Sequence, residues 1–315
     1  MGKKAQYIIE NDKLSQNETD HLGWPHSFIE EGMLNTLPDD YDGWFCFTRM
    51  DFSIGDWAVI SGLPEALKKK HPKIKIAFPS RKWFIDLLGT HMNSWNFSKH
   101  HNAIDNFDII FKNNPHIDYL FDPGEIKQIF TDHDRCWFAP DSNLPIVEQV
   151  LLRFGFTTDD LNTIDSRPSL YFTQEEVDTA KYIVGDEKYG CLLFSSRIER
   201  LKGRWKDDNL LKEARKFKDT PVYYYSDFDL EGTEWDEIFP VRYNFAKMGL
   251  TFREQLCIKA RAEFNLSYQS GVSDAVAKTT ESIVLCPYNS PKANTVRNVK
   301  YVFIDKDLEL IFNKI

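Results

Sequence analysis

Cysteine, glycine and proline are sparse in this chain, and each scarcity excludes a class of protein. Only 5 of the 315 residues are cysteine, and neither a CxxC pair nor a metal-ligand spacing joins them. This usage predicts buried thiols in a reducing compartment rather than a disulfide scaffold or a zinc site. Glycine and proline number 15 and 14, too few for a collagen-like or low-complexity chain.

The chain also lacks a long hydrophobic run and a positive net charge. No stretch approaches the roughly 18 apolar residues of a membrane span, and the start of the chain has no signal-peptide core. The net charge is −9, whereas duplex nucleic acid is bound by clustered positive charge. We therefore expect a soluble, cytoplasmic protein without a nucleic-acid partner.

The chain repeats one local pattern: a short apolar run, then a turn, then an amphipathic helix. This pattern is typical of an α/β protein. The expected strands are 44–48, 74–78, 107–111, 117–121, 191–194, 221–225, 264–268, 283–286 and 301–304. The expected helices are a segment around Val59 to Leu67 that Pro64 kinks or restarts, then 81–88, 145–154, 208–217, 251–262 and 274–279.

The length of 315 residues favours two domains. The stretch 157–167 is polar and aperiodic, which predicts a linker. We expect one domain over 1–165 and a second over 166–315. We expect residues 1–43 to be an extra segment that completes the first sheet or covers one side of the first domain.

The sharpest candidate site is Ser53-Ile54-Gly55-Asp56, between a strand and a helix. Ligands bind at such turns in open α/β sheets. Gly55 allows close approach, and Asp56 could accept a proton from a hydroxyl. Alternatively, Asp56 only caps the helix. The helix N-terminus should lower the pKa of Asp56.

Two further segments suit a diphosphate. Four basic side chains within 195–205, between a strand and a helix, could donate charge-assisted hydrogen bonds, or form a solvated loop. The turn 269–274 would present backbone N–H groups at a helix start. Neither GxGxxG nor GxxxxGK[ST] occurs, which disfavours nicotinamide and P-loop chemistry.

A metal site is an alternative. Asp227 and Asp229, which follow an expected strand, could hold Mg²⁺ or Mn²⁺. The segment 132–134 is a weaker candidate for the same kind of metal site.

The order of these motifs resembles glycosyltransferase family 9, the ADP-heptose:lipopolysaccharide heptosyltransferases. The resemblance runs from about residue 44 to 304. It begins with the Gly55-Asp56 pair before a helix containing Pro64, and it continues through the segments 71–76, 167–176, 195–205, 270–273 and 283–287.

The resemblance implies a GT-B fold, with two Rossmann-like domains facing across a cleft, and inverting, metal-independent transfer from a nucleotide sugar, without a cofactor. Asp56 would be the base, beside Gly55 on the acceptor side. Lys202 would neutralise the donor diphosphate, a role that Arg200 or Arg204 could take instead. The remaining implied donor contacts are Arg197, Glu231 at the ribose, and the backbone of Ser270, Gly271, Val272 and Ser273.

This chain departs from the family pattern at two positions. Gln269 stands where the family has an aspartate, and Asp274 stands where it has a histidine. The sugar, the base and the acceptor therefore stay open, and so does a nucleotide-sugar-binding protein without catalysis. The acceptor would be a glycan or another hydroxyl-bearing molecule, and a lipid-linked one would bring peripheral membrane contact.

Overall fold

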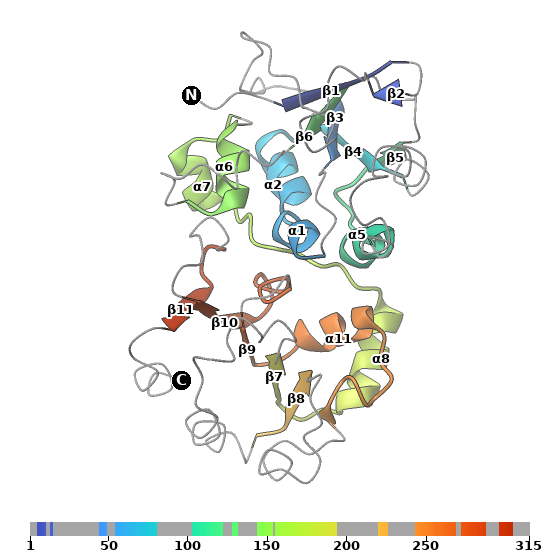
Figure 1. Ribbon diagram of the computed structural model, residues 1–315, viewed down its shortest axis with the longest axis vertical. Coiled ribbons are helices and arrows are strands. Elements are labelled where there is room, and N and C mark those ends of the chain that lie inside the picture. Colours follow the sequence, from blue (N-terminus) through green and yellow to red (C-terminus); the bar gives the residue numbers. More distant parts are fainter. Residues whose placement is uncertain are drawn as a thin grey trace. The chain divides into compact units, whose positions relative to one another are not determined.

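The computed structural model describes a set of separate segments of the chain. These are residues 5–10, 13–14, 44–48, 54–80, 103–121, 128–131, 144–153, 155–193, 220–225, 243–268, 272–287 and 296–304. The chain divides into two compact units (Figure 1). Unit 1 is Met1–Arg167 with Lys292–Asn294, and unit 2 is Pro168–Pro291 with Thr295–Ile315. The division therefore follows Arg167, close to the boundary expected after residue 165.

Unit 1 contains a sheet of six described strands in the order β2-β1-β6-β3-β4-β5. The strands are β1 Ala5–Glu10, β2 Lys13–Leu14, β3 Trp44–Thr48, β4 Lys75–Pro79, β5 Tyr119–Phe121 and β6 Gln128–Thr131. Strands β6, β3, β4 and β5 run parallel, whereas β1 is antiparallel to both β6 and β2. The described part of the extra N-terminal segment thus completes the sheet.

The helices of unit 1 differ from expectation at two places. They are α1 Ile54–Val59, α2 Leu63–Lys70, α5 Ala103–Phe111, α6 Ile146–Arg153 and α7 Thr158–Thr163. The expected strand at 107–111 is wrong, because these residues form the second half of α5. Phe107, Ile110 and Phe111 are buried while Asp108 is exposed, a helical spacing that a five-residue apolar window cannot reveal.

The expected linker at 157–167 also contains a helix. In α7, the Thr157 hydroxyl accepts from the Asp160 N–H and the Asp160 carboxylate accepts from the Thr157 N–H, a reciprocal cap. Buried Leu161 anchors this short helix.

The break expected at Pro64 is confirmed: α1 ends at Val59, and the chain becomes helical again at Leu63, where α2 begins with Pro64 in its first turn.

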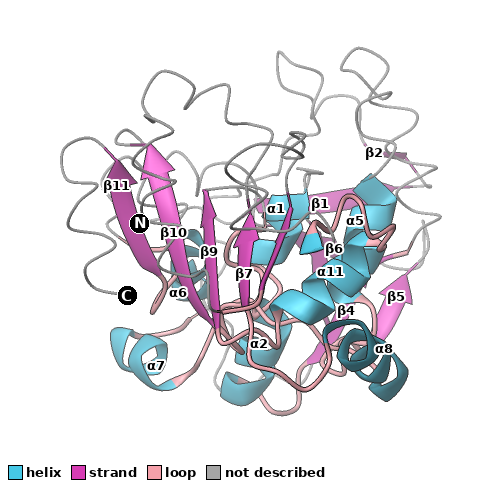
Figure 2. Ribbon diagram, turned by 90° about the horizontal axis from the view of Figure 1, so that it is seen from below, coloured by secondary structure: helices cyan, strands magenta, loops and turns pink. Residues whose placement is uncertain are grey.

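Unit 2 contains a sheet of five described strands, all parallel, in the order β11-β10-β9-β7-β8. The strands are β7 Gly190–Leu193, β8 Val222–Tyr225, β9 Phe264–Tyr268, β10 Glu281–Pro287 and β11 Lys300–Ile304. All five were expected from the sequence. Figure 2 shows the arrowheads of β7, β9, β10 and β11 pointing the same way.

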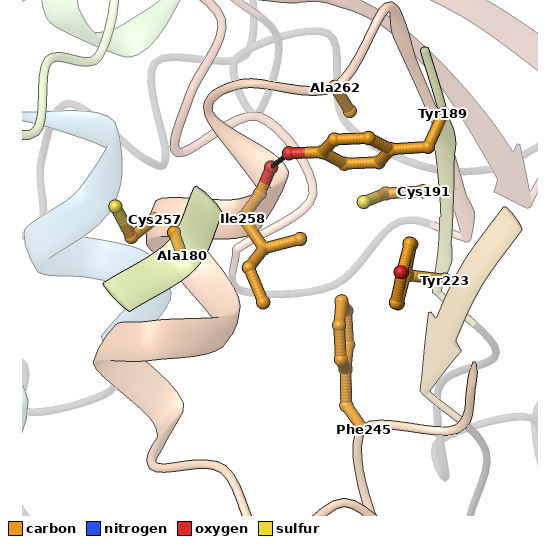
Figure 3. Packing of buried hydrophobic residues seen from close by; sticks show 8 residues of the cluster. All are labelled: Ala180, Tyr189, Cys191, Tyr223, Phe245, Cys257, Ile258 and Ala262. Carbon is orange, nitrogen blue, oxygen red and sulfur yellow. Dashed lines mark hydrogen bonds between the residues drawn. The ribbon is translucent and has the colours of Figure 1, made fainter. Parts of the chain in front are cut away.

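Two helices of unit 2, α8 Gln174–Val184 and α11 Phe252–Lys259, begin with reciprocal threonine–glutamate caps. Arg253 joins them, with its Nε 2.5 Å from Glu176 Oε1. Aromatic side chains fill the core beside them (Figure 3): Tyr189 and Tyr223 meet edge to face at 5.3 Å, and the Tyr189 hydroxyl donates to the Ile258 carbonyl at 2.8 Å. The helix expected at 274–279 is instead a series of hydrogen-bonded turns over 272–279.

The helices expected at 81–88 and 208–217 lie outside the described residues. Within the described segments, no helix combines the length and the apolar character needed to cross a membrane.

Candidate functional site

The strand order of unit 2 reverses at one pair of strands. Chain order would be β7, β8, β9, β10 and β11, but β7 lies between β8 and β9. This is the 2-1-3-4-5 order of a doubly wound sheet, in which ligands bind outside the carboxyl ends of the two strands at the reversal. Strands β7 and β9 pair in parallel, from Gly190 beside Phe264 to Leu193 beside Ser267. Their carboxyl ends therefore share one edge.

Both sequence segments predicted to hold a diphosphate leave from this edge. The basic segment 195–205 follows β7, which ends at Leu193, and the turn 269–274 follows β9, which ends at Tyr268. The two segments are about 70 residues apart in sequence, and the parallel pairing of β7 and β9 brings their starting points together. Most of the predicted donor contacts lie outside the described residues: Arg197, Arg200, Lys202, Arg204, Glu231, Ser270 and Gly271.

The described part of the turn rests on a buried lysine. Lys259, the last residue of α11, is only 7 % exposed. Its Nζ donates to the Val272 carbonyl at 2.9 Å and to the Ser273 carbonyl at 3.0 Å. Burial lowers the pKa of Lys259 to about 8, and the nearby negative charge of Asp274 opposes this shift. Val272 and Ser273, both predicted donor contacts, are themselves buried.

Asp274 lies in the same buried cluster. Its carboxylate Oδ2 accepts a hydrogen bond of 2.6 Å from the Tyr301 hydroxyl, and it is 6 % exposed. Burial raises the pKa of Asp274, and the hydrogen bond from Tyr301 opposes that shift. Tyr301 also accepts from the Val296 N–H at 2.8 Å. The acidic residue that departs from the family pattern therefore has a half-buried hydrogen-bond partner on β11.

Unit 1 has a reversal of its own, between β3 and β6. The parallel strands run β6-β3-β4-β5, so β3 lies between strands that follow it in the chain. The parallel pairing sets Thr48 beside Thr131 at the carboxyl ends. The chain leaving β3 leads to α1, in which Asp56 is the third residue. Asp56 is thus in the first turn of the helix, two positions past the start, and the N-cap interpretation does not fit this placement.

The side chains beside Asp56 fix α1 against the core. Trp57 is fully buried and meets Phe107 at 5.2 Å and Phe111 at 5.8 Å, edge to face in both cases. Figure 1 shows the resulting pair of helices, α1 and α5, side by side. Gly55 is half-buried. The packing of Trp57 therefore holds the helix that carries Asp56 against α5.

Sequence reasoning missed Lys259 and Tyr301. Lys259 carried no signal of burial, because a lysine in the last turn of a helix is favoured by the helix dipole and is ordinarily solvated there. Tyr301 carried no such signal, because its strand pattern does not reveal which buried group its hydroxyl meets.

Among the residues that the structure describes, no cluster of three or more histidine, cysteine or acidic side chains could hold a metal ion. Asp227 and Asp229, the alternative metal ligands, lie outside the described residues, as do residues 132–134.

Comparison with known proteins adds information on the fold. No family model and no curated protein matches the sequence. A solved glycosyl transferase family 9 structure from Veillonella parvula matches with a TM-score of 0.58 and 14 % identity, over 85 % of this chain and 87 % of that one. ADP-heptose lipopolysaccharide heptosyltransferase II from E. coli matches with a TM-score of 0.43 and 12 % identity, over 82 % and 90 %.

The Veillonella comparison carries the conclusion about the fold. The chain resembles a family 9 glycosyltransferase over most of both lengths, and its two α/β units with parallel strands agree with the expected class. The resemblance that the sequence motifs indicated is confirmed at this level. The cleft expected between two facing domains stays a prediction.

Proposed function

We propose that this protein is an inverting, metal-independent glycosyltransferase of the GT-B type that moves a sugar from a nucleotide-sugar donor to an acceptor hydroxyl. One observation supports the proposal most strongly. The basic segment and the glycine turn, selected from the sequence for diphosphate binding, leave from adjacent strand ends at the reversal of the unit 2 sheet. That is where an open α/β sheet binds its ligand.

Unit 2 is the donor side in this proposal. Lys202 and the neighbouring arginines would neutralise the diphosphate, because charge-assisted hydrogen bonds are strongest where charge accumulates. Backbone N–H groups of 270–273 would add to them, and Glu231 would contact the ribose. As the bond from the sugar to the diphosphate breaks, negative charge develops on the departing phosphate, so these donors act on the transition state.

Unit 1 supplies the base. Asp56 would take the proton from the acceptor hydroxyl while that oxygen attacks the anomeric carbon from the face opposite the leaving group. The nucleoside diphosphate departs with the electron pair of the broken bond, and the configuration inverts. A carboxylate in the first turn of a helix is stabilised in its ionised form. It therefore acts through its position rather than through strong basicity.

The proposal is tested by separating binding from turnover. Nucleotide sugars of different base and sugar are screened by their effect on the melting temperature, since a ligand that binds only the folded state raises it. Each ligand that binds is then assayed for hydrolysis and for transfer to glycan acceptors, with and without EDTA. We expect a donor that stabilises the protein and is turned over equally in both conditions.

Two outcomes of this experiment contradict parts of the proposal. Loss of turnover in EDTA, with recovery on adding Mg²⁺ or Mn²⁺, would replace the metal-independent mechanism with one that uses Asp227 and Asp229. Binding of a nucleotide sugar without hydrolysis or transfer, across the acceptor panel, would make the protein a binding protein rather than an enzyme.

A further inference from the structure

The helix that carries the proposed base is too short to hold itself in place. Helix α1 has six residues, Ile54–Val59, whereas an isolated helix in water is marginal below roughly 12–15 residues. Its position therefore depends on what its side chains pack against. Because Asp56 is the third residue of α1, the same contacts decide where the proposed base lies.

One side chain dominates these contacts. Trp57, which directly follows Asp56, is 0 % exposed and is the largest of the fully buried side chains that the structure describes. Its ring meets Phe107 at 5.2 Å and Phe111 at 5.8 Å, with interplanar angles of 82° and 85°. An edge-to-face contact depends on the orientation of both rings. Trp57 therefore fixes the rotation of α1 about its own axis as well as its distance from α5.

The two rings that receive Trp57 are themselves held by the sheet. Phe107 and Phe111 lie one turn apart on α5, 5.0 Å from each other. Phe78, a buried residue of β4, packs against both of them, at 5.8 Å and 4.8 Å. Trp57 thus meets a pair of rings that strand β4 supports from behind, and this support cannot easily shift when α1 moves.

The two ends of α1 are held in different ways. At its end, the Ser61 hydroxyl donates to the Ala58 carbonyl at 2.7 Å, and both residues are fully buried. At its start, residues 54–55 are only half-buried. Among the described neighbours of Asp56 on this helix, Trp57 is the nearest one that is fully buried. Loss of the indole ring should therefore loosen the start of α1 while its end stays fixed.

We propose that Trp57 is the positioning residue of the base: by packing α1 against the two phenylalanines of α5, it sets the rotation of the helix and with it the place of Asp56 at the acceptor hydroxyl. The inference rests on the proposed function. Successive helix residues lie about 100° apart around the axis, so fixing one residue fixes the direction of the next. A base that acts through its position is sensitive to this, since a displacement of about 1 Å can cost about 10²-fold in rate.

The test asks whether Trp57 acts through Asp56, and it is a double-mutant cycle of the native protein, Trp57→Leu, Asp56→Asn and the double variant. The donor probes are ADP-, UDP- and GDP-linked hexoses, with methyl glycosides as acceptors. Release of the nucleoside diphosphate gives kcat and KM, and thermal melts establish that each variant is folded. Phe156→Leu is the matched control, because Phe156 is a buried ring of the same unit that meets His71 and Lys70 at the end of α2.

We expect Trp57→Leu to lower kcat by about 10–10²-fold, with KM for the donor unchanged because unit 2 supplies the donor contacts. Trp57→Phe, which keeps a ring against α5, should lose only about two- to fivefold. Phe156→Leu should lower the melting temperature but leave kcat near the native value. In the Asp56→Asn background, Trp57→Leu should cause no further loss, because the group that it positions is already absent. A merely structural role would lower the rate equally in both backgrounds.

Each failure has its own signature. If the native protein releases no nucleoside diphosphate from any probe, or if Asp56→Asn keeps native turnover, the proposed function or its base falls and this inference falls with it. If Asp56→Asn is slow but a folded Trp57→Leu has native turnover, or loses the same factor in both backgrounds, only the inference about Trp57 is overturned. If Trp57→Leu does not fold, Trp57→Phe takes its place in the cycle, and an unchanged kcat contradicts the inference.

Discussion

The Tyr301 hydroxyl on β11 donates a 2.6 Å hydrogen bond to the carboxylate of Asp274, in the turn after β9. Asp274 is buried and Tyr301 is half-buried, and their hydrogen bond connects strand β11, across β10, to the candidate donor turn. A position that differs from the family pattern is thus accounted for by a contact inside this chain. The contact gives a stability prediction.

Tyr301→Phe should lower the free energy of unfolding by about 1–3 kcal/mol. The substitution removes the donor to a buried carboxylate and also the acceptor of the Val296 N–H at 2.8 Å. Urea unfolding followed by circular dichroism measures the change. Tyr182→Phe is the matched control, because Tyr182 is 91 % exposed, and it should leave stability unaltered. Equal stability of the two variants would contradict the role given to Tyr301.

The interactions of the Asp160 carboxylate should make the free energy of unfolding depend on pH. Its carboxylate accepts from Lys70 Nζ at 2.7 Å and from the Thr157 N–H at 2.7 Å, and the hydrogen bond from Lys70 is the main cause that lowers its pKa from 3.8 to about 2. A depressed pKa in the folded state stabilises above the unfolded value, so this contribution is complete above pH 4 and is lost between about pH 4 and 2.

Asp160→Asn should therefore cost about 1 kcal/mol at pH 7, a modest amount because the pair contacts solvent. The difference between native and variant protein should shrink as the pH falls below 4. The free energy of unfolding at a series of pH values measures it, with Asp159→Asn, an exposed neighbour, as control. A native–variant difference that stays constant down to pH 2.5 would show that the ion pair is not responsible.

Gly62 sits where a side chain has no room. A Cβ at this position would lie 2.5 Å from the Ser166 carbonyl oxygen and also against the Arg167 carbonyl oxygen, both of them backbone atoms that cannot rotate away. Gly62→Ala should lower stability by about 1–3 kcal/mol through this overpacking. Thermal unfolding measures it, against Lys73→Ala at an exposed site of the same unit. An unchanged melting temperature would mean that the close approach is easily relieved.

Asp56→Asn tests the proposed base. The variant should fold normally and bind the donor, but transfer should slow by about 10²–10⁴-fold, the usual contribution of a positioned base. The rate of product formation at saturating donor measures the effect. Asp186→Asn, an exposed aspartate of unit 2, should keep native activity. Near-native turnover of Asp56→Asn would remove Asp56 from the mechanism.

The sequence predicted the fold well where local signals were strong. The strand 44–48, the break at Pro64, the cap at Thr251 and all five strands of unit 2 are found in the structure. The prediction at 107–111 was wrong, since a short apolar run is shared by buried strands and buried helix faces. The linker prediction missed α7 because a six-residue helix with one buried leucine leaves almost no periodic signal.

For the candidate site, the segments could be predicted from the sequence, but only the strand order shows that two of them start from adjacent strand ends. Asp56 and the turn at 270–273 were selected as candidates from residue types next to expected strand ends. The contacts beneath that turn were not predicted: Lys259 and Tyr301 contact residues of the turn that lie 13 to 27 positions away. Such contacts depend on packing, which no local pattern encodes.

The sequence by itself determined the α/β class, the alternation of strands and helices, and the acidic and basic candidate residues of the site. These features can be read from sequence because hydrophobic period, turn residues and caps act within a few residues of one another. Only the tertiary structure decided that β7 lies between β8 and β9, and so which segments start from one edge. It also decided that Lys259 and Asp274 are interior. Strand order and burial arise from the packing of the whole sheet, since parallel strands pair across long stretches of chain.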